Sequence, residues 1–345
     1  MDLYRLGSVG WQESQLIYHA LPRLGLEGLI ILSPASPYVC IGYHQDAEQE
    51  VDLAFCRAQG IPVFRREVGG GAVYLDGGQI FYQLVLDRGH PLAQGSKEDF
   101  YRRMLAPVVA TYRDLGLDAT YKPVNDIVAG GRKISGNGAG EIAGSLVLVG
   151  NLIVDFDYDS MVRVLRVPDE KFRDKVHKSL RDNLTTLRRE LASVPPVPEL
   201  EDLLIRRFSE VLGPLTPRAL PASVPGEVQR LALERISEPW LLRRGKRTPE
   251  RRLKIASGRE VIRRAYKAPG GLIRATVETA DGLLASLDLS GDFFFYPPDQ
   301  LEVLATSLAG TPLSGIEAAI GDFYARAGVE SPGVSPADLA KAICG

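Results

Sequence analysis

FRREVGGGAVYLDGGQIFYQLVL, residues 64–86, decides how the rest of the chain is interpreted. Two arginines, Arg65 and Arg66, lead into three consecutive glycines, and an apolar run of strand length follows them. Glycine takes positive φ readily and lets backbone amides approach a ligand, while arginine supplies forked, permanently charged donors for carboxylate or phosphate. The stretch is typical of a loop that holds an anionic ligand. Because Arg65 and Arg66 occupy successive strand positions, we expect one of them to face the ligand, and Arg66 is nearer the glycines.

A second glycine-rich stretch, KPVNDIVAGGRKISGNGAGEIAG at residues 122–144, predicts a β-hairpin. Residues 127–128 form one strand, Gly130 and Gly131 the tight turn, and residues 132–134 the return strand. Successive side chains of a strand point to opposite faces. Arg132 and Lys133 therefore cannot both face the same pocket.

The bulk composition describes an ordinary soluble protein with room for two domains. Of the 345 residues, 45% are hydrophobic and 24% are charged, and the formal net charge is -2, which argues against a general nucleic-acid or membrane-surface role. No apolar run reaches membrane-spanning length and the N-terminus lacks the layout of a secretion signal, so we expect a cytoplasmic protein. The three cysteines show no CxxC spacing, which indicates neither a disulfide framework nor a zinc site.

The order of apolar runs predicts an α+β fold with a mixed, largely antiparallel sheet packed with helices. The runs with strand length are residues 29–32, 38–43, 80–86 and 146–156. The clearest helix spans residues 97–115, with a capping signal at Ser96 and Gly116 as its end. Strands and helices do not alternate as in a dinucleotide-binding sheet, and the glycine-rich pieces look like hairpin turns.

Two proline-rich stretches, residues 193–200 and 214–227, are expected to be connections on either side of a helix. A new set of alternating strands begins near residue 252. We therefore divide the chain into a larger N-terminal domain, residues 1–250, and a smaller α+β domain, residues 251–345.

Two spaced motifs carry a resemblance to a known family. RRxxGGGxVxxD at residues 65–76 and NDIxxxGxKISG at residues 125–136 resemble the lipoate-protein ligase A family, which shares its catalytic fold with biotin protein ligases and octanoyltransferases. KAPGGLIRATVE at residues 267–278 and SGDFFFYP at residues 290–297 look like the accessory domain or small subunit of these ligases. The resemblance implies ATP-dependent, Mg²⁺-assisted activation of lipoate or octanoate to an acyl-AMP, and transfer of the acyl group to a lysine of an acceptor lipoyl domain.

The resemblance also assigns residues to the site. Lys133 is the catalytic residue, whose ammonium would neutralise the lipoate carboxylate and the α-phosphate oxygens, and Asp126 is the candidate Mg²⁺ ligand. The substrate-binding and adenylate-binding residues are Arg66, Gly69, Gly70, Gly71, Ala72, Asp76, Asn125, Asp126, Ser135 and Gly136. Plainer structural roles remain open: a solvated hairpin lysine at 133, an Asx-type turn at Asp126, and a simple turn at Asp76.

Some positions depart from the family pattern. Leu75 and Val149 stand where many members of the family have histidine. These replacements suggest a divergent branch with altered acyl-chain or acceptor preference, or with weak or lost activity. The apolar residues Val39, Ile41 and Val73 would suit either a lipoyl tunnel or an ordinary core.

Two other functions compete with the ligase. Acyl transfer through a cysteine thioester would need an activated thiolate in the pocket, and Cys40 lies near a possible substrate wall, although Cys40 and Cys56 also suit buried structural positions. A non-catalytic lipoyl-binding scaffold is the other alternative.

The segment 230–267 is strongly basic, with 13 Lys or Arg against 4 Asp or Glu. We expect it to attract an acidic acceptor domain by long-range electrostatic steering, with a solvated helical face as the alternative.

Overall fold

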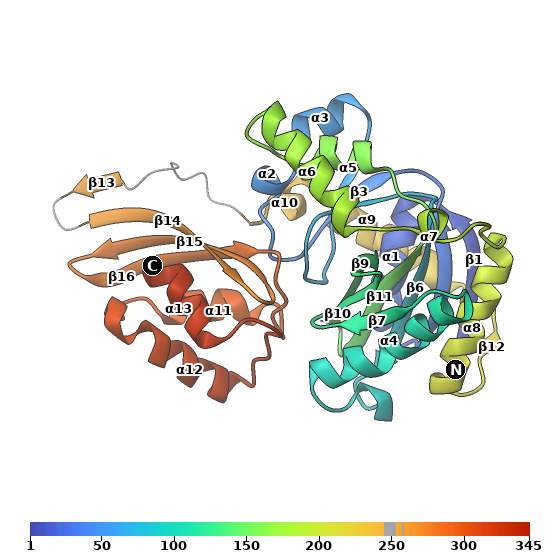
Figure 1. Ribbon diagram of the computed structural model, residues 1–345. Coiled ribbons are helices and arrows are strands. Elements are labelled where there is room, and N and C mark those ends of the chain that lie inside the picture. Colours follow the sequence, from blue (N-terminus) through green and yellow to red (C-terminus); the bar gives the residue numbers. More distant parts are fainter. Residues whose placement is uncertain (245–252, 257–258) are drawn as a thin grey trace.

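The structure is a computed structural model that describes residues 1–244, 253–256 and 259–345 (Figure 1). The predicted division between residues 250 and 251 lies outside the described residues and stays a prediction. The chain on either side of it builds its own sheets and hydrophobic cores, as the following paragraphs describe.

The largest sheet has six strands and forms the centre of the N-terminal part. In spatial order its strands are β10 (Asn137–Ile142), β11 (Ser145–Ile153), β6 (Gln79–Asp87), β2 (Gly28–Pro34), β1 (Asp2–Val9) and β12 (Thr216–Pro217). The pairs from β10 to β2 are antiparallel, and the two pairs that involve β1 are parallel. This mixed sheet confirms the predicted α+β fold.

Helices cover both faces of this sheet. They are α1 (Trp11–Arg23), α4 (Lys97–Asp114), α8 (Val197–Leu212) and α9 (Ser223–Arg235). Tyr82, Leu84 and Leu86 of β6 belong to the core formed with α4 and α8. Phe81 and Val85 of the same strand belong to the core formed with α1 and α9. The period of two along β6 thus divides its side chains between two helical layers.

Two three-stranded sheets flank the six-stranded one. They consist of β4 (Val63–Arg65), β3 (Tyr38–Ile41) and β5 (Val73–Leu75), and of β7 (Ala119–Lys122), β8 (Asp126–Ala129) and β9 (Arg132–Ser135). The predicted hairpin is confirmed, because β8 pairs with β9 and both turn glycines, Gly130 and Gly131, have positive φ. Gly144 also belongs to a hairpin turn, between β10 and β11. The glycines at 69–71 and 77–78 do not form hairpin turns, which corrects the prediction for those two pieces. β4 and β5 both pair with β3 instead of with each other, and β5 and β6 lie in different sheets.

The proline-rich stretches are not simple connections. Helix α8 begins at Val197, inside the first stretch, and α9 begins at Ser223, inside the second. Proline lacks a backbone N–H, but the first turn of a helix has no acceptor for that group, so Pro198 and Pro225 fit there. The helix predicted at residues 97–115 is confirmed as α4, with Ser96 accepting a hydrogen bond from the amide of Asp99.

A four-stranded antiparallel sheet forms the C-terminal part. Its strands are β13 (Leu253–Ala256), β14 (Arg259–Ala268), β15 (Gly271–Ala280) and β16 (Leu283–Gly291). Helices α11 (Gln300–Ser307), α12 (Ile316–Ala327) and α13 (Pro336–Cys344) lie on one side of it (Figure 1). The side chains of β15 alternate between buried and partly buried positions, as expected for a sheet with one covered face.

Residues 293–296, here called the aromatic segment, join the two parts. Phe293 and Phe295 belong to the C-terminal core, whereas Phe294 and Tyr296 belong to the core of the N-terminal part. The hydroxyl of Tyr296 donates to the carbonyl oxygen of Ala139, 2.9 Å away. Alternate side chains of one extended segment therefore anchor in two different cores.

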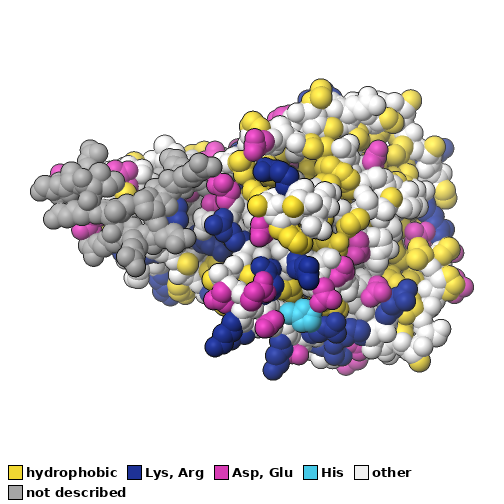
Figure 2. Space-filling model, turned by 90° about the horizontal axis from the view of Figure 1, so that it is seen from above, with side chains coloured by type: hydrophobic (Ala, Val, Ile, Leu, Met, Phe, Trp, Pro, Cys, Tyr) yellow, Lys and Arg dark blue, Asp and Glu magenta, His cyan; other side chains and the backbone are white. Residues whose placement is uncertain are grey.

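The remaining helices are short or lie at the surface. They are α2 (Ala47–Glu50), α3 (Leu53–Ala58), α5 (Tyr158–Val164), α6 (Glu170–Asn183), α7 (Leu187–Glu190) and α10 (Glu238–Leu241). On the face seen in Figure 2, Lys and Arg side chains are interspersed with Asp and Glu. Among the described residues, no helix is long and apolar enough to cross a membrane.

Candidate active site

One cavity brings most of the predicted site residues together. It holds about 690 Å³ of space free of atoms, counting the part open to solvent. The predicted residues that line it are Arg66, Gly70, Gly71, Asn125, Lys133 and Gly136. Gly69, Ala72, Asp76, Asp126 and Ser135 are not among its lining residues, but all of them belong to the two motifs that form it. The two motifs therefore meet at one place in the fold.

The glycine loop between β4 and β5 is held by Arg66. Its Nη2 donates to the carbonyl oxygens of Gly69 and Gly71, at 2.7 and 2.9 Å. Gly70 has a φ of +93°, a conformation that favours glycine. A Cβ on Gly42, the residue directly after β3, would collide with the carbonyl oxygen of Gly70. The conformation of the loop therefore also requires glycine at position 42.

Arg65 points away from the cavity. Its guanidinium is fully buried and donates to backbone carbonyl oxygens, including those of Gln45 and Leu241, each at 2.6 Å. Burial lowers the pKa of Arg65 to about 9, and the positive charges of Arg244 and Arg243 add to the effect. Of the two arginines, only Arg66 lines the cavity.

The β8–β9 hairpin presents Lys133 to the cavity. Its Nζ lies 2.6 Å from Oδ1 of Asp126, and the lysine side chain is 36% exposed. Arg132, the preceding residue, forms an ion pair with Glu190 instead, at 2.6 Å. The two neighbours face different surroundings, as strand alternation requires.

Sequence reasoning missed an amide network beside the lysine. Oδ1 of Asn151 accepts from the backbone N–H of Gly136 at 2.9 Å, and its Nδ2 donates to Gln79 at 2.6 Å. Asn137 donates to the carbonyl oxygen of Asn125 at 2.9 Å, and both residues line the cavity. The available signal was an asparagine in the apolar run 146–156, because a polar side chain in a buried strand needs partners.

Ser135 and Asp76 do not line the cavity, and both hydrogen-bond to backbone groups instead. The buried hydroxyl of Ser135 donates to the carbonyl oxygen of Asn151 at 2.6 Å. Asp76 accepts from the amide of Gly78 at 2.9 Å, which makes an Asx-type turn, and burial raises the pKa of its carboxyl.

Part of the cavity wall is apolar. It is lined by Val73, Leu75, Phe81 and Val149, so Leu75 and Val149, the two departures from the family pattern, are both part of this wall. Val39 and Ile41, the other candidates for a lipoyl tunnel, pack instead in a separate core with α3 and α5. Cys40, between them, faces the cavity because β3 turns its odd and even residues to opposite sides.

Cys40 is buried, and burial raises the pKa of its thiol, although the nearby charge of Arg66 acts in the opposite direction. Nη1 of Arg66 lies 3.6 Å from the sulfur. The thiol is therefore mostly protonated at neutral pH, unlike an activated cysteine nucleophile.

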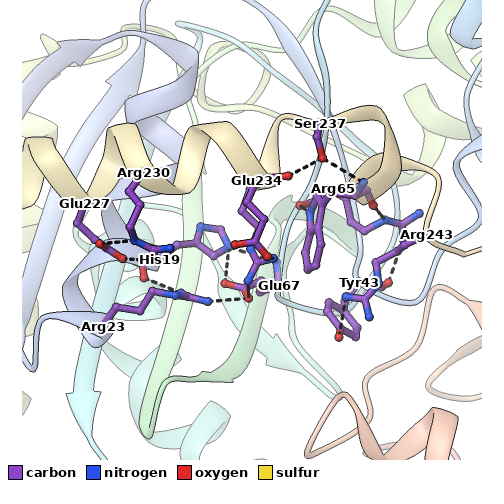
Figure 3. A network of polar contacts seen from close by, with 12 residues as sticks. His19, Arg23, Tyr43, Arg65, Glu67, Glu227, Arg230, Glu234, Ser237 and Arg243 are labelled. Atoms are coloured by element: carbon purple, nitrogen blue, oxygen red, sulfur yellow. Dashed lines mark hydrogen bonds and ion pairs between the residues drawn. The ribbon is translucent and has the colours of Figure 1, made fainter.

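A buried polar network ties the start of the glycine loop to helices α1 and α9 (Figure 3). Glu67 accepts from Arg23 at 2.8 Å and from Arg235 at 2.9 Å. The backbone N–H of Glu67 donates to Nε2 of His19 at 3.2 Å. Burial lowers the pKa of His19 to about 4, so the imidazole is the neutral acceptor at pH 7.

Comparison with known proteins places the chain in a family. The model of the lipoyl protein ligase A/B catalytic domain matches residues 12–209. Lipoate-protein ligase A subunit 1 of Thermoplasma acidophilum is 39% identical over 189 residues, which cover 50% of this chain and 68% of that protein. Octanoyltransferase LipM of Kyrpidia tusciae is 28% identical over 232 residues, which cover 60% and 84%.

A crystal structure of lipoate-protein ligase A bound with ATP is also similar. It superposes with a TM-score of 0.59 at 28% identity, and covers 70% of this chain and 98% of that one. The family match spans more than half of the chain and includes both motifs of the cavity. This chain therefore belongs to the lipoyl protein ligase A/B catalytic domain family.

Proposed function

We propose that this protein is an ATP-dependent lipoate-protein ligase. In the first half-reaction the carboxylate of lipoate, or of octanoate, attacks the α-phosphate of MgATP, and pyrophosphate leaves. In the second, the amine of an acceptor lysine attacks the acyl carbon, and AMP leaves. The observation that carries the proposal is that Gly70 and Lys133, from separate motifs, line the same cavity.

Lys133 acts on the developing charge. In the ligand-free protein its ammonium is paired with Asp126, and in the proposed reaction it turns to the acyl carboxylate and the α-phosphate. The backbone of Gly69, Gly70 and Gly71 cradles the phosphate, and Arg66 keeps that loop in shape. The glycine loop is held in place by Arg66 before the substrate arrives, which lowers the reorganisation that the reaction requires.

The remaining predicted residues would hold the nucleotide and its metal. Asn125 and Gly136 line the cavity near the lysine, Ser135 hydrogen-bonds to the backbone of Asn151 beside them, and Asp76 and Ala72 support the strand after the glycine loop. Mg²⁺ would enter as part of MgATP. Among the described residues no group of three or more His, Cys, Asp or Glu is placed to hold a metal, and a single carboxylate such as Asp126 fits an ion bound mainly by phosphates and water.

The partner that we propose is an acidic lipoyl-acceptor domain, and its docking surface is the basic segment 230–267. Several of its arginines already have partners: Arg235 pairs with Glu67, and Arg243 and Arg244 lie 3.5 and 3.0 Å from Glu302. Residues 245–252 lie outside the described residues. We expect the reaction in the cytoplasm.

The direct test is incubation of the purified protein with ATP, Mg²⁺ and lipoate, followed by measurement of pyrophosphate and by mass spectrometry for retained lipoyl-AMP. The ligase should release pyrophosphate and retain the adenylate, and Lys133→Met should do neither. Binding of lipoate without pyrophosphate would favour the scaffold alternative.

Cys40 supports a second candidate, acyl transfer through a thioester, because it is the cysteine that lines the cavity. The raised pKa of its thiol weighs against it. Cys40→Ser decides the matter: full activity of this variant excludes a thioester on Cys40, and loss of acyl transfer with intact folding supports it.

A further inference from the structure

One buried side-chain amide in the wall of the cavity has a hydrogen-bond partner for its nitrogen but, among the described residues, none for its oxygen. Gln83 of β6 is 1% exposed and lines the cavity. Its Nε2 donates to the carbonyl oxygen of Ser14 at 2.6 Å, and because a carbonyl only accepts, this contact fixes which end of the amide is which. No described residue donates a hydrogen bond to its Oε1. A buried acceptor of this kind is costly unless a ligand supplies the donor.

Gln83 lines the cavity at some distance from Lys133. In the antiparallel pair of β6 and β11, Phe81 is opposite Asn151 and Gln83 is opposite Val149. Two residues along a strand span about 7 Å. Asn151 holds the amide of Gly136, which lines the cavity beside Lys133. A medium-chain acid with its carboxylate at Lys133 would therefore bring the far part of its chain to Gln83.

The other polar side chains on the Gln83 side of the cavity form hydrogen bonds with one another. Gln15 donates to the hydroxyl of Tyr38 at 2.6 Å and accepts from the hydroxyl of Tyr18 at 3.0 Å. The surrounding wall, formed by Phe81 and Val149, is apolar. Gln83 thus adds one acceptor to a surface that otherwise selects only for shape and apolar character.

We propose that Gln83 selects acyl groups that carry a hydrogen-bond donor at their far end, and that the preferred substrate is the reduced, dithiol form of lipoate. Its thiols, on the sixth and eighth carbons, can donate to Oε1. The cyclic disulfide of oxidised lipoate and the methyl end of octanoate have no such donor. This inference rests on the proposed function and specifies the substrate of that site.

The test compares acids in an ATP–pyrophosphate exchange assay on the full-length protein in deoxygenated buffer. The acids are dihydrolipoate, lipoate, octanoate and 8-hydroxyoctanoate, and the last two differ only by a terminal hydroxyl. We expect kcat/KM about tenfold higher for dihydrolipoate than for lipoate, and higher for 8-hydroxyoctanoate than for octanoate. Equal values within both pairs would overturn the inference.

Gln83→Met assigns the preference to this residue, since methionine keeps the length of the side chain but has no amide oxygen. The ratios within both pairs should fall to about one, while octanoate remains a substrate. Val149→Ala is the matched control: it changes the opposite residue of the same wall without changing hydrogen bonding, so the hydroxyoctanoate-to-octanoate ratio should persist. A ratio that survives in Gln83→Met contradicts the role of Gln83.

The outcomes of this assay distinguish the ligase activity from the selection by Gln83. If none of the four acids supports exchange, the ligase activity itself is wrong. If all four support exchange with similar kcat/KM, the ligase stands and the selection by Gln83 does not.

Discussion

Phe294 of the C-terminal part packs directly on Gly69 of the glycine loop. A Cβ added to Gly69 would lie 2.9 Å from Cδ1 of Phe294 and 2.9 Å from the carbonyl oxygen of Phe293. The loop is therefore enclosed between Arg66 on one side and the aromatic segment on the other. The two parts of the chain meet at the place where we propose that the phosphate binds.

Phe294→Ala should weaken both folding and adenylation. Removal of a fully packed phenylalanine typically costs about 3–5 kcal/mol, and here it also leaves the glycine loop unsupported. Urea denaturation and pyrophosphate release measure the two effects. Phe172→Ala is the control, because Phe172 on α6 is 47% exposed and its removal should change the free energy of unfolding by less than about 0.5 kcal/mol. Full adenylation activity in a folded Phe294→Ala protein would contradict the coupling.

Gly70→Ala should abolish adenylation with only a moderate loss of stability. Its positive φ strains any other residue by about 1–2 kcal/mol, and the new methyl group would lie 3.0 Å from Nη2 of Arg66. Gly116→Ala imposes the same kind of strain at φ +85°, but no atom lies within 4 Å of the added carbon. Similar melting temperatures with activity lost only at Gly70 would separate the role of the loop from backbone strain.

Lys133→Met should lower kcat/KM for adenylation by roughly 100-fold or more, since it removes a charge aimed at the reacting carboxylate and phosphate. Arg132→Met, one residue earlier on the same strand, removes an equal charge that pairs with Glu190. Its adenylation rate should stay within a few-fold of wild type. If both variants lose activity equally, general destabilisation of the hairpin, and not the ammonium of Lys133, explains the loss.

The stability of the protein should decrease in mild acid because of His19. Its pKa is about 4 in the folded protein, against 6.5 for an ordinary histidine, so between these values the unfolded chain binds a proton that the folded chain does not. The free energy of unfolding should therefore fall by about 3 kcal/mol as the pH drops from 7 to 4. Urea denaturation of His19→Gln across this range should show a shallower dependence, and an identical slope would rule out His19 as the cause.

Transfer of the acyl group to an acidic acceptor should slow as salt is added. Steering by the segment 230–267 acts over a distance that salt shortens, so the second-order rate constant should fall with ionic strength while pyrophosphate release, which needs no acceptor, stays nearly constant. Stopped-flow or quenched assays at low and high salt measure both. A transfer rate constant that does not change with ionic strength would contradict electrostatic steering of the acceptor.

Local periodicity was enough to predict part of the site. The alternation of side chains correctly separated Arg132 from Lys133, and the Gly-Gly dipeptide located the hairpin turn. The same rule could not choose between a lipoyl tunnel and an ordinary core for Val39 and Ile41, because the sequence does not say which side of β3 faces the cavity; the structure places both in a core.

Apart from the meeting of the two family motifs, contacts between residues distant in sequence could not be predicted. Asn151 meets Gly136, and Phe294 meets Gly69, only because strands and segments that are far apart in the sequence pack together. No local pattern encodes such a pairing. The motifs indicated which residues are special, and the packing of the sheets shows what they contact.

The aromatic segment does not tolerate a change in its length. Since Phe293 and Phe295 enter one core and Phe294 and Tyr296 the other, inserting or deleting a single residue here would exchange the two sets. Both cores would then lose the aromatic side chains that fill them. Many surface loops tolerate added residues, but at these four positions the spacing matters as much for packing as the identity of the residues.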